Sequence, residues 1–311
     1  MEKIPVILDT DIGGDIDDTW ALAYLLSRPE LDLKLVTISS QSPRYAAKIV
    51  AKFCQTVGFE NIPIGLGFRM ATNVGVAEEP LDQRDWVEDY SIDSYPGEVY
   101  DDGIGALIDC IRKSSSKIML ITIGPASNIA DALNRAPDIA DKVILKSMFG
   151  SIYKGYEGPS KCTECNVVTD IPAAKRMISG FPDITITPLD TCFDIPSSTE
   201  QYRRLEEKEN ENVLVKALLE NHRIWCRNHP RWEGRPADRW DYICDVAAIY
   251  LAYDESLVNI ETLPIIVDDK GYMQIDNEKG NRIRAALTWT DNNKFVDIMI
   301  DSLLSFKSPE N

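Results

Sequence analysis

Five aspartates lie close together near the start of the chain, and their crowding suggests a site for a cation. They fall within ten residues, directly after the apolar run at residues 5–8. Crowded carboxylates repel one another unless water or a positive charge separates them, and a hard cation with oxygen ligands is the natural partner. The alternative is a solvated acidic turn in which one of the last two acids caps a helix. The five acids are Asp9, Asp11, Asp15, Asp17 and Asp18.

The elements on either side of these acids favour the cation site. The apolar run at residues 5–8, followed by Gly13 and Gly14, is typical of a buried strand that ends in a turn. Residues 19–27 carry apolar side chains that can pack inward, which predicts a helix. The acids should therefore lie at the carboxyl end of a first strand, where open α/β sheets bind their ligands.

Length, composition and charge narrow the class of protein. The 311 residues are 44% hydrophobic and 27% charged, which is ordinary for a globular protein with a large core. The net charge of −17 argues against nucleic acid as a partner, because phosphate backbones attract basic surfaces. Neither a transmembrane span nor a signal peptide fits the sequence, so we expect a cytoplasmic protein without a membrane partner.

Seven scattered cysteines are expected to be free thiols in that compartment. Cys162 and Cys165 have the C-x-x-C spacing of a redox pair or of half a zinc site. Neither chemistry is favoured, because the chain has no second C-x-x-C and just two histidines, His222 and His229.

Strands and helices alternate over the first two thirds of the chain, which predicts a parallel sheet covered by helices. Right-handed crossovers place the carboxyl ends of parallel strands on one edge, so Asp11, Ser39, Ile123 and Met148 should share a rim. The irregular, polar residues 68–101 form either part of a pocket wall or an ordinary surface excursion. The apolar strands are expected at residues 31–38, 62–67, 117–124, 143–150 and 184–190.

The remainder is expected to be mainly helical, with a short antiparallel addition to the sheet. Asp245 lies in apolar surroundings within one predicted helix. We therefore expect an α/β fold with an open, mostly parallel, Rossmann-like sheet flanked by helices, in a single domain over residues 1–311. Helices are predicted at residues 197–221, 241–253 and 292–306, a loop at 225–240, and antiparallel strands at 263–267, 273–275 and 283–287.

Four stretches within residues 5–250 carry motifs in a fixed order: the acid cluster, residues 123–130, residues 162–174 and the pair Cys244-Asp245. Together they make the chain resemble the inosine-uridine preferring nucleoside hydrolases. The acid cluster looks like that family's metal motif, and residues 123–130 resemble its G-P-L-T-N-I-A segment. Residues 162–174 resemble its E-F-N-x-x-x-D-P-x-A-A segment, and Cys244-Asp245 stands where the family has a late H-D or C-D pair.

This resemblance implies hydrolysis of the N-glycosidic bond of small ribonucleosides, giving free base and ribose, with a tightly bound Ca²⁺. Carried over to this chain, Asp11, Asp18 and Asp245 ligate Ca²⁺ by carboxylate, and Ile123 ligates it by its backbone carbonyl. Asp11 is also the expected general base for the metal-bound water, with Asp245 beside it in the catalytic centre. Homodimers or homotetramers are usual in the family. The expected substrate-binding residues are Asp17, Gln41, Met148, Glu164, Asn166 and Asp245.

The chain departs from the family pattern in three places. The common motif is D-x-D-P-G-x-D-D, whereas this chain has two extra residues and a fifth acid, Asp15, for which we expect a role outside the metal's direct ligands. The loop after the second strand offers Ser40 or Gln41 where the family offers an asparagine for the ribose. Cys244 stands where the best-known branch has a histidine that protonates the leaving base. Other proton sources are His222, His229, Tyr242, Trp225 and water.

Two other functions fit part of the pattern. A phosphatase of the haloacid dehalogenase type also has an Asp-x-Asp pair after its first strand, but it needs a lysine after a later strand and a late acidic Mg²⁺ motif. The second is a protein of the same fold that binds a ribosyl ligand without turnover, which the missing histidine and asparagine keep open. Retention of calcium and release of base from a nucleoside panel distinguish these functions.

Overall fold

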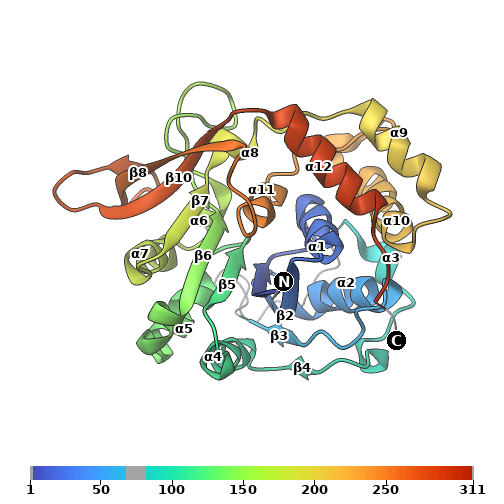
Figure 1. Ribbon diagram of the computed structural model, residues 1–311, viewed down its shortest axis with the longest axis horizontal. Coiled ribbons are helices and arrows are strands. Elements are labelled where there is room, and N and C mark those ends of the chain that lie inside the picture. The colour runs from blue at the N-terminus through green and yellow to red at the C-terminus, as the bar shows by residue number, and fades with distance from the viewer. Residues whose placement is uncertain (1–2, 68–81, 310–311) are drawn as a thin grey trace.

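The computed structural model describes residues 3–67 and 82–309, and a single sheet runs through them (Figure 1). The strands in these residues are β1 (Ile4–Thr10), β2 (Leu31–Ile38), β3 (Ile64–Leu66), β4 (Val99–Tyr100), β5 (Ile118–Thr122), β6 (Val143–Met148), β7 (Ile184–Thr187), β8 (Val258–Val267), β9 (Met273–Ile275) and β10 (Asn281–Trp289). These ten strands pair in the order β4-β3-β2-β1-β5-β6-β7-β10-β8-β9. Pairing is parallel from β4 to β10 and antiparallel from β10 through β8 to β9.

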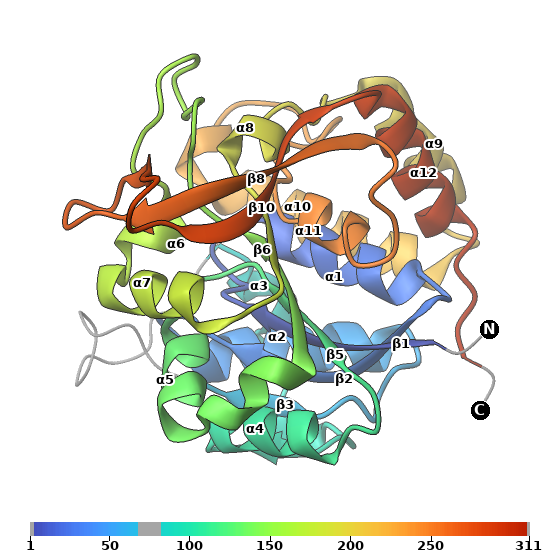
Figure 2. The ribbon, with the colours of Figure 1, turned by 60° about the vertical axis from the view of Figure 1, so that its left-hand side comes forward.

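Helices cover both faces of the sheet, as Figures 1 and 2 show. The described α-helices are α1 (Asp17–Ser27), α2 (Pro43–Thr56), α3 (Arg84–Val87), α4 (Gly103–Lys113), α5 (Ser127–Arg135), α6 (Cys165–Val168), α7 (Ile171–Gly180), α8 (Leu189–Cys192), α9 (Thr199–Lys208), α10 (Val213–Asn228), α11 (Val246–Tyr250) and α12 (Asn292–Leu304). Successive side chains of β1 point to opposite faces. Val6 and Leu8 join the core with α1, α2, α10 and α12, whereas Ile7 joins the core with α4, α5 and α7. The predicted α/β class is confirmed, including the antiparallel addition.

The strand order reverses beside β1, and this position determines where a ligand can bind. The chain moves outward from β1 to β4, returns to β5 on the other side of β1, and then continues outward through β6 and β7. Such a switch point leaves a crevice at the carboxyl ends of the strands. The parallel registers bring Asp11, Ser39, Ile123 and Met148 to this edge, as the alternation predicted.

Two predicted helices have different boundaries in the structure. The charged segment 197–221 divides into α9 and α10, because the Asn212 side chain accepts hydrogen bonds from the first backbone N–H groups of α10. Helix α10 then continues to Asn228, so Trp225 lies in a helix and not in the predicted loop. The helix predicted at 241–253 is shorter: α11 covers Val246–Tyr250, and Asp245 immediately precedes it.

The described part of the irregular stretch predicted at residues 68–101, which is residues 82–101, is partly helical. Residues 68–81 lie outside the described residues, but α3 and β4 occupy part of the remainder. Among the described helices, none combines the length and hydrophobicity needed to cross a bilayer.

Candidate active site

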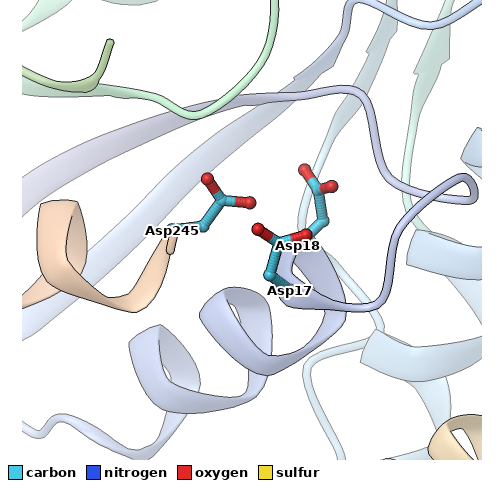
Figure 3. Close-up of side chains that lie close together, drawn as sticks. All are labelled: Asp17, Asp18 and Asp245. Carbon is cyan, nitrogen blue, oxygen red and sulfur yellow. The ribbon is translucent and has the colours of Figure 1, made fainter. Parts of the chain in front are cut away.

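Three carboxylates from two helix starts meet at the switch point of the sheet. Asp17 and Asp18 begin α1, and Asp245 precedes α11; one oxygen of each lies within 4.8 Å of the other two. Figure 3 shows Asp245 facing the other two side chains across the space between the helices. Asp18 and Asp245 are buried. Buried like charges at this spacing favour a bound cation, and the oxygen donors suit a hard one.

The turn before α1 is built to present these acids. Gly13 adopts a φ of +116°, which side-chain-bearing residues rarely adopt, and a Cβ there would lie 3.0 Å from the Tyr45 ring. The Thr10 hydroxyl donates a hydrogen bond to Asp18 and accepts one from the Ile12 backbone N–H. Ile16 takes the cap position of α1, so neither Asp17 nor Asp18 serves as the helix cap. Neither carboxylate is therefore used to cap α1.

Asp11 belongs to the same electrostatic cluster. Burial raises the pKa of its carboxyl well above the usual range, and the neighbouring Asp17 raises this pKa further. Burial likewise raises the pKa of Asp18 and that of Asp245, and Asp11 adds to both shifts. Each acid therefore disfavours charge on the others, which a cation among them would reverse.

The end of β5 approaches Asp11 closely. A Cβ added to Gly124 would lie 3.0 Å from both the Asp11 backbone nitrogen and Asp11 Oδ1, so the strand end needs a glycine there. The Ile123 carbonyl accepts a hydrogen bond from Asn166 Nδ2 at 3.2 Å. The same amide nitrogen lies 3.2 Å from the Met148 carbonyl. Asn166 thus ties the ends of β5 and β6 together beside the acids.

Glu164 is buried and holds the backbone beside Asn166 in place. Its carboxylate accepts hydrogen bonds from the backbone N–H groups of Gly150, Asn166 and Val167 at 2.9, 2.8 and 3.2 Å. Burial raises the Glu164 pKa, and these hydrogen bonds oppose the shift. The carboxylate therefore fixes the position of Asn166 whether or not it also contacts a ligand.

Asp9, the acid within β1, makes hydrogen bonds inside the sheet. Asp9 is fully buried, and its Oδ1 accepts hydrogen bonds from Thr37 Oγ1 at 2.5 Å and Asn128 Nδ2 at 2.7 Å. Burial raises its pKa to about 7.

The loop after β2 holds the two residues suggested for the ribose. Gln41 is exposed after β2, and Ser40 beside it is buried.

The comparison that decides the family covers almost the whole chain. The model of the inosine-uridine preferring nucleoside hydrolase family matches residues 6–299. The chain belongs to this family. It is therefore an enzyme of the class that cleaves N-glycosidic bonds of ribonucleosides.

Relatives and solved structures agree with this family. Uridine nucleosidase 1 of Arabidopsis thaliana is 22% identical over 272 residues, covering 84% of this chain and 80% of its own. The non-specific ribonucleoside hydrolase RihC of Escherichia coli O127:H6 is 26% identical over 230 residues, covering 71% and 73%. The plant nucleoside hydrolase PpNRh1 has the same fold, with a TM-score of 0.81, 22% identity, and coverage of 97% of this chain and 99% of its own.

Two of the proton sources suggested by sequence are fully engaged in this nucleoside hydrolase. His222 is buried; its Nδ1 accepts a hydrogen bond from Trp20 Nε1 at 3.0 Å, and its Nε2 lies 3.1 Å from the Arg239 carbonyl. Burial lowers the His222 pKa to about 4, so the ring is neutral and structural. Trp225 is also buried, and its Nε1 donates to the Gly14 carbonyl at 3.0 Å.

The other two side chains lie nearer the surface. His229 Nδ1 lies 2.6 Å from Asp82 Oδ2, and its side chain is 20% exposed. Tyr242 is 45% exposed and stacks on Phe193 with ring centroids 3.8 Å apart. The partners of both residues come from distant segments of the chain, which no local sequence pattern indicates.

The Cys244 thiol lies beside the acid cluster and, after burial and the neighbouring aspartates, adds to the rise of the Asp245 pKa. Cys244 is buried next to Asp245, and its hydrogen bond with Cys192, together with burial, raises its pKa well above that of a free thiol. Cys162 and Cys165 are both free thiols, and burial raises the Cys165 pKa to about 11. A group with a pKa that high is not a reactive thiolate at neutral pH.

Proposed function

We propose that this chain hydrolyses the N-glycosidic bond of ribonucleosides in a Ca²⁺-dependent reaction that gives free base and ribose. The observation that carries the proposal is the meeting of Asp17, Asp18 and Asp245 at the switch-point crevice of a nucleoside hydrolase fold. Calcium takes six to eight oxygen ligands, and this crevice offers carboxylate and carbonyl oxygens.

The proposed ligands are Asp11, Asp18 and Asp245 by carboxylate and Ile123 by its carbonyl. The mutual rise of the carboxyl pKa values supports a shared cation, and the close contact of Gly124 with Asp11 supports a place for the Ile123 carbonyl beside it. Asp17 is close enough to the other acids to bind the cation as well. We assign it to the ribose hydroxyls, as the family resemblance implies.

Asp11 is the proposed general base. Burial and the neighbouring acids make the Asp11 carboxylate more basic than a carboxylate in bulk solvent. Higher basicity suits a group that must accept a proton from the attacking water molecule. Bound Ca²⁺ would supply Lewis acidity and a fixed anchor for the ribose. The sugar develops positive charge as the bond to the base breaks, and the surrounding carboxylates stabilise that charge.

The proposed ribose contacts are Asp17, Gln41, Met148, Glu164, Asn166 and Asp245. The contacts of the Asn166 amide with the Ile123 and Met148 carbonyls, beside the acids, support Asn166 and Met148 best. As further parts of the proposal, the chain is one domain, cytoplasmic, and assembles as a homodimer or homotetramer. Light scattering of the purified protein measures the assembly.

The alternative is a ribosyl-binding protein without turnover, and the buried Cys244 in place of a histidine is the observation that favours it. A panel of natural ribonucleosides and an activated aryl riboside tests both functions. Release of base from natural nucleosides supports the hydrolase. Turnover of the aryl riboside alone shows a working sugar site that lacks leaving-group activation, and binding without any turnover supports the alternative.

A further inference from the structure

One arginine joins the two chain segments that deliver the clustered carboxylates. Arg231 Nη2 donates a hydrogen bond to Asp15 Oδ1 at 2.5 Å. The Nε of the same guanidinium lies 2.8 Å from Asp241 Oδ2. Asp15 is two residues before Asp17, and Asp241 is four residues before Asp245. A single rigid group therefore spans the turn before α1 and the segment before α11.

The side chains around Arg231 hold the same turn. Trp225 Nε1 donates to the Gly14 carbonyl at 3.0 Å, and the Arg231 guanidinium lies over the Trp225 ring, 5.7 Å from its centroid. The His229 ring stacks on the same Trp225 ring, with the ring centroids 4.5 Å apart. Its Nε2 lies 3.7 Å from Asp15 Oδ1. The end of α10 and the residues after it thus form a support for the turn.

The exposure of the three side chains limits what this bridge can add to the stability of the fold. Asp241 is 13% exposed, whereas Arg231 and Asp15 are 44% and 47% exposed. Ion pairs this exposed stabilise a fold very little. A planar guanidinium with two carboxylate partners nevertheless fixes geometry better than a point charge does.

We propose that Arg231 is a positioning residue that sets the distance between the Asp17–Asp18 pair and Asp245 and so tunes the affinity of the cation site. The inference rests on the proposed function, because it needs a cation at these acids. It gives a role to Asp15 and the two-residue extension of the acid motif: the longer turn reaches the Arg231 guanidinium.

The test measures Ca²⁺ affinity of the metal-stripped full chain by calorimetry, together with its thermal unfolding without metal. We expect Arg231→Gln to weaken Ca²⁺ binding by about tenfold or more, as is typical when a group that orients metal ligands is removed. The unfolding midpoint should stay within about 2 °C of wild type, because the pair is exposed. Arg231→Lys should restore part of the affinity, since its ammonium reaches one carboxylate at a time.

Arg235→Gln is the matched control, because Arg235 lies in the same loop over the Trp232 ring at 5.6 Å. It should bind Ca²⁺ as wild type does. Asp15→Asn removes one arm of the bridge and should weaken binding less than Arg231→Gln. The double variant should be no weaker than Arg231→Gln, because both changes act through one contact.

Each outcome decides between the inference and the proposed function. Equal Ca²⁺ affinity of Arg231→Gln and wild type overturns the inference and leaves the proposed function standing. Loss of affinity that Arg235→Gln shares, or a large fall in the unfolding midpoint, assigns Arg231 a general structural role and also overturns the inference. A wild-type chain that binds no Ca²⁺ overturns both.

Discussion

At the scale of single residues, the five motif aspartates have different surroundings and therefore different roles. Asp9 binds Thr37 and Asn128 within the sheet, and Asp15 binds Arg231 at the surface. Burial raises the pKa values of Asp11, Asp17 and Asp18, and the charges of neighbouring aspartates raise them further. The sequence predicts a role for Asp15 outside the metal's direct ligands; this stays a prediction, which the contact of Asp15 with Arg231 supports.

Replacing Asp11 by asparagine tests the proposed base. The amide keeps the size of the side chain but cannot accept the proton of the attacking water, so kcat/KM for a ribonucleoside should fall by about 10²–10⁴-fold. Steady-state assays with saturating Ca²⁺ measure this loss. Asp109→Asn, at an exposed ion pair with Lys113, is the control. Activity retained in the Asp11 variant refutes the assignment.

His222 should affect stability and not chemistry. His222→Phe keeps an aromatic ring but leaves Trp20 Nε1 and the Arg239 carbonyl without their partner, so the free energy of unfolding should drop by about 1–3 kcal/mol. Denaturant titration gives that change, and kcat measured below the unfolding transition should stay close to wild type. A selective fall in kcat on natural nucleosides, with normal turnover of an aryl riboside, would instead make His222 a proton donor.

At the scale of elements, the sheet was predictable because apolar strands alternate with helices at regular spacing. The shared rim of Asp11, Ile123 and Met148 followed from strand direction alone. The position of Asp245 just before a short helix did not follow from strand direction. Residues 241–253 are apolar enough to predict a longer helix, but α11 begins only at Val246. The contact of Asp241 with Arg231, which precedes α11, cannot be read from the sequence. Long-range contacts of this kind depend on the completed fold.

The end of β5 gives a second test at this scale. Gly124→Ala places a Cβ about 3.0 Å from Asp11 Oδ1 and its backbone nitrogen, so Asp11 must shift. We expect a loss of about tenfold or more in Ca²⁺ affinity and in kcat/KM, because small displacements of ligating groups are costly. In the control Gly14→Ala, the new Cβ meets nothing within 4 Å. Equal effects of the two substitutions would show that the Gly124 contact is unimportant.

At the scale of the whole molecule, the acid cluster should make stability depend on pH and on metal together. Burial and mutual repulsion raise the pKa values of Asp11, Asp17, Asp18 and Asp245, so the metal-free folded chain binds more protons than the unfolded chain. The contribution of these carboxyl groups to the free energy of unfolding is therefore complete below the pKa that they have in the unfolded chain. It declines as the pH rises through the pKa values that they have in the folded chain.

Thermal unfolding between about pH 5 and about pH 8 measures this dependence. With a chelator present, the midpoint should fall as pH rises across that range. Added Ca²⁺ should raise the midpoint most at the high end, because the ionised carboxylates bind it there. Asp245→Asn should flatten the metal-free pH dependence. A metal-free midpoint that rises with pH throughout would contradict the description of the cluster.

Ca²⁺-dependent hydrolysis is measured by assaying the purified chain on natural ribonucleosides with Ca²⁺ and after its removal by a chelator. We expect release of free base and ribose with Ca²⁺, loss of that activity on chelation, and recovery when Ca²⁺ is returned. Absence of base release from every nucleoside in the presence of Ca²⁺, or full activity after the metal is removed, would contradict it.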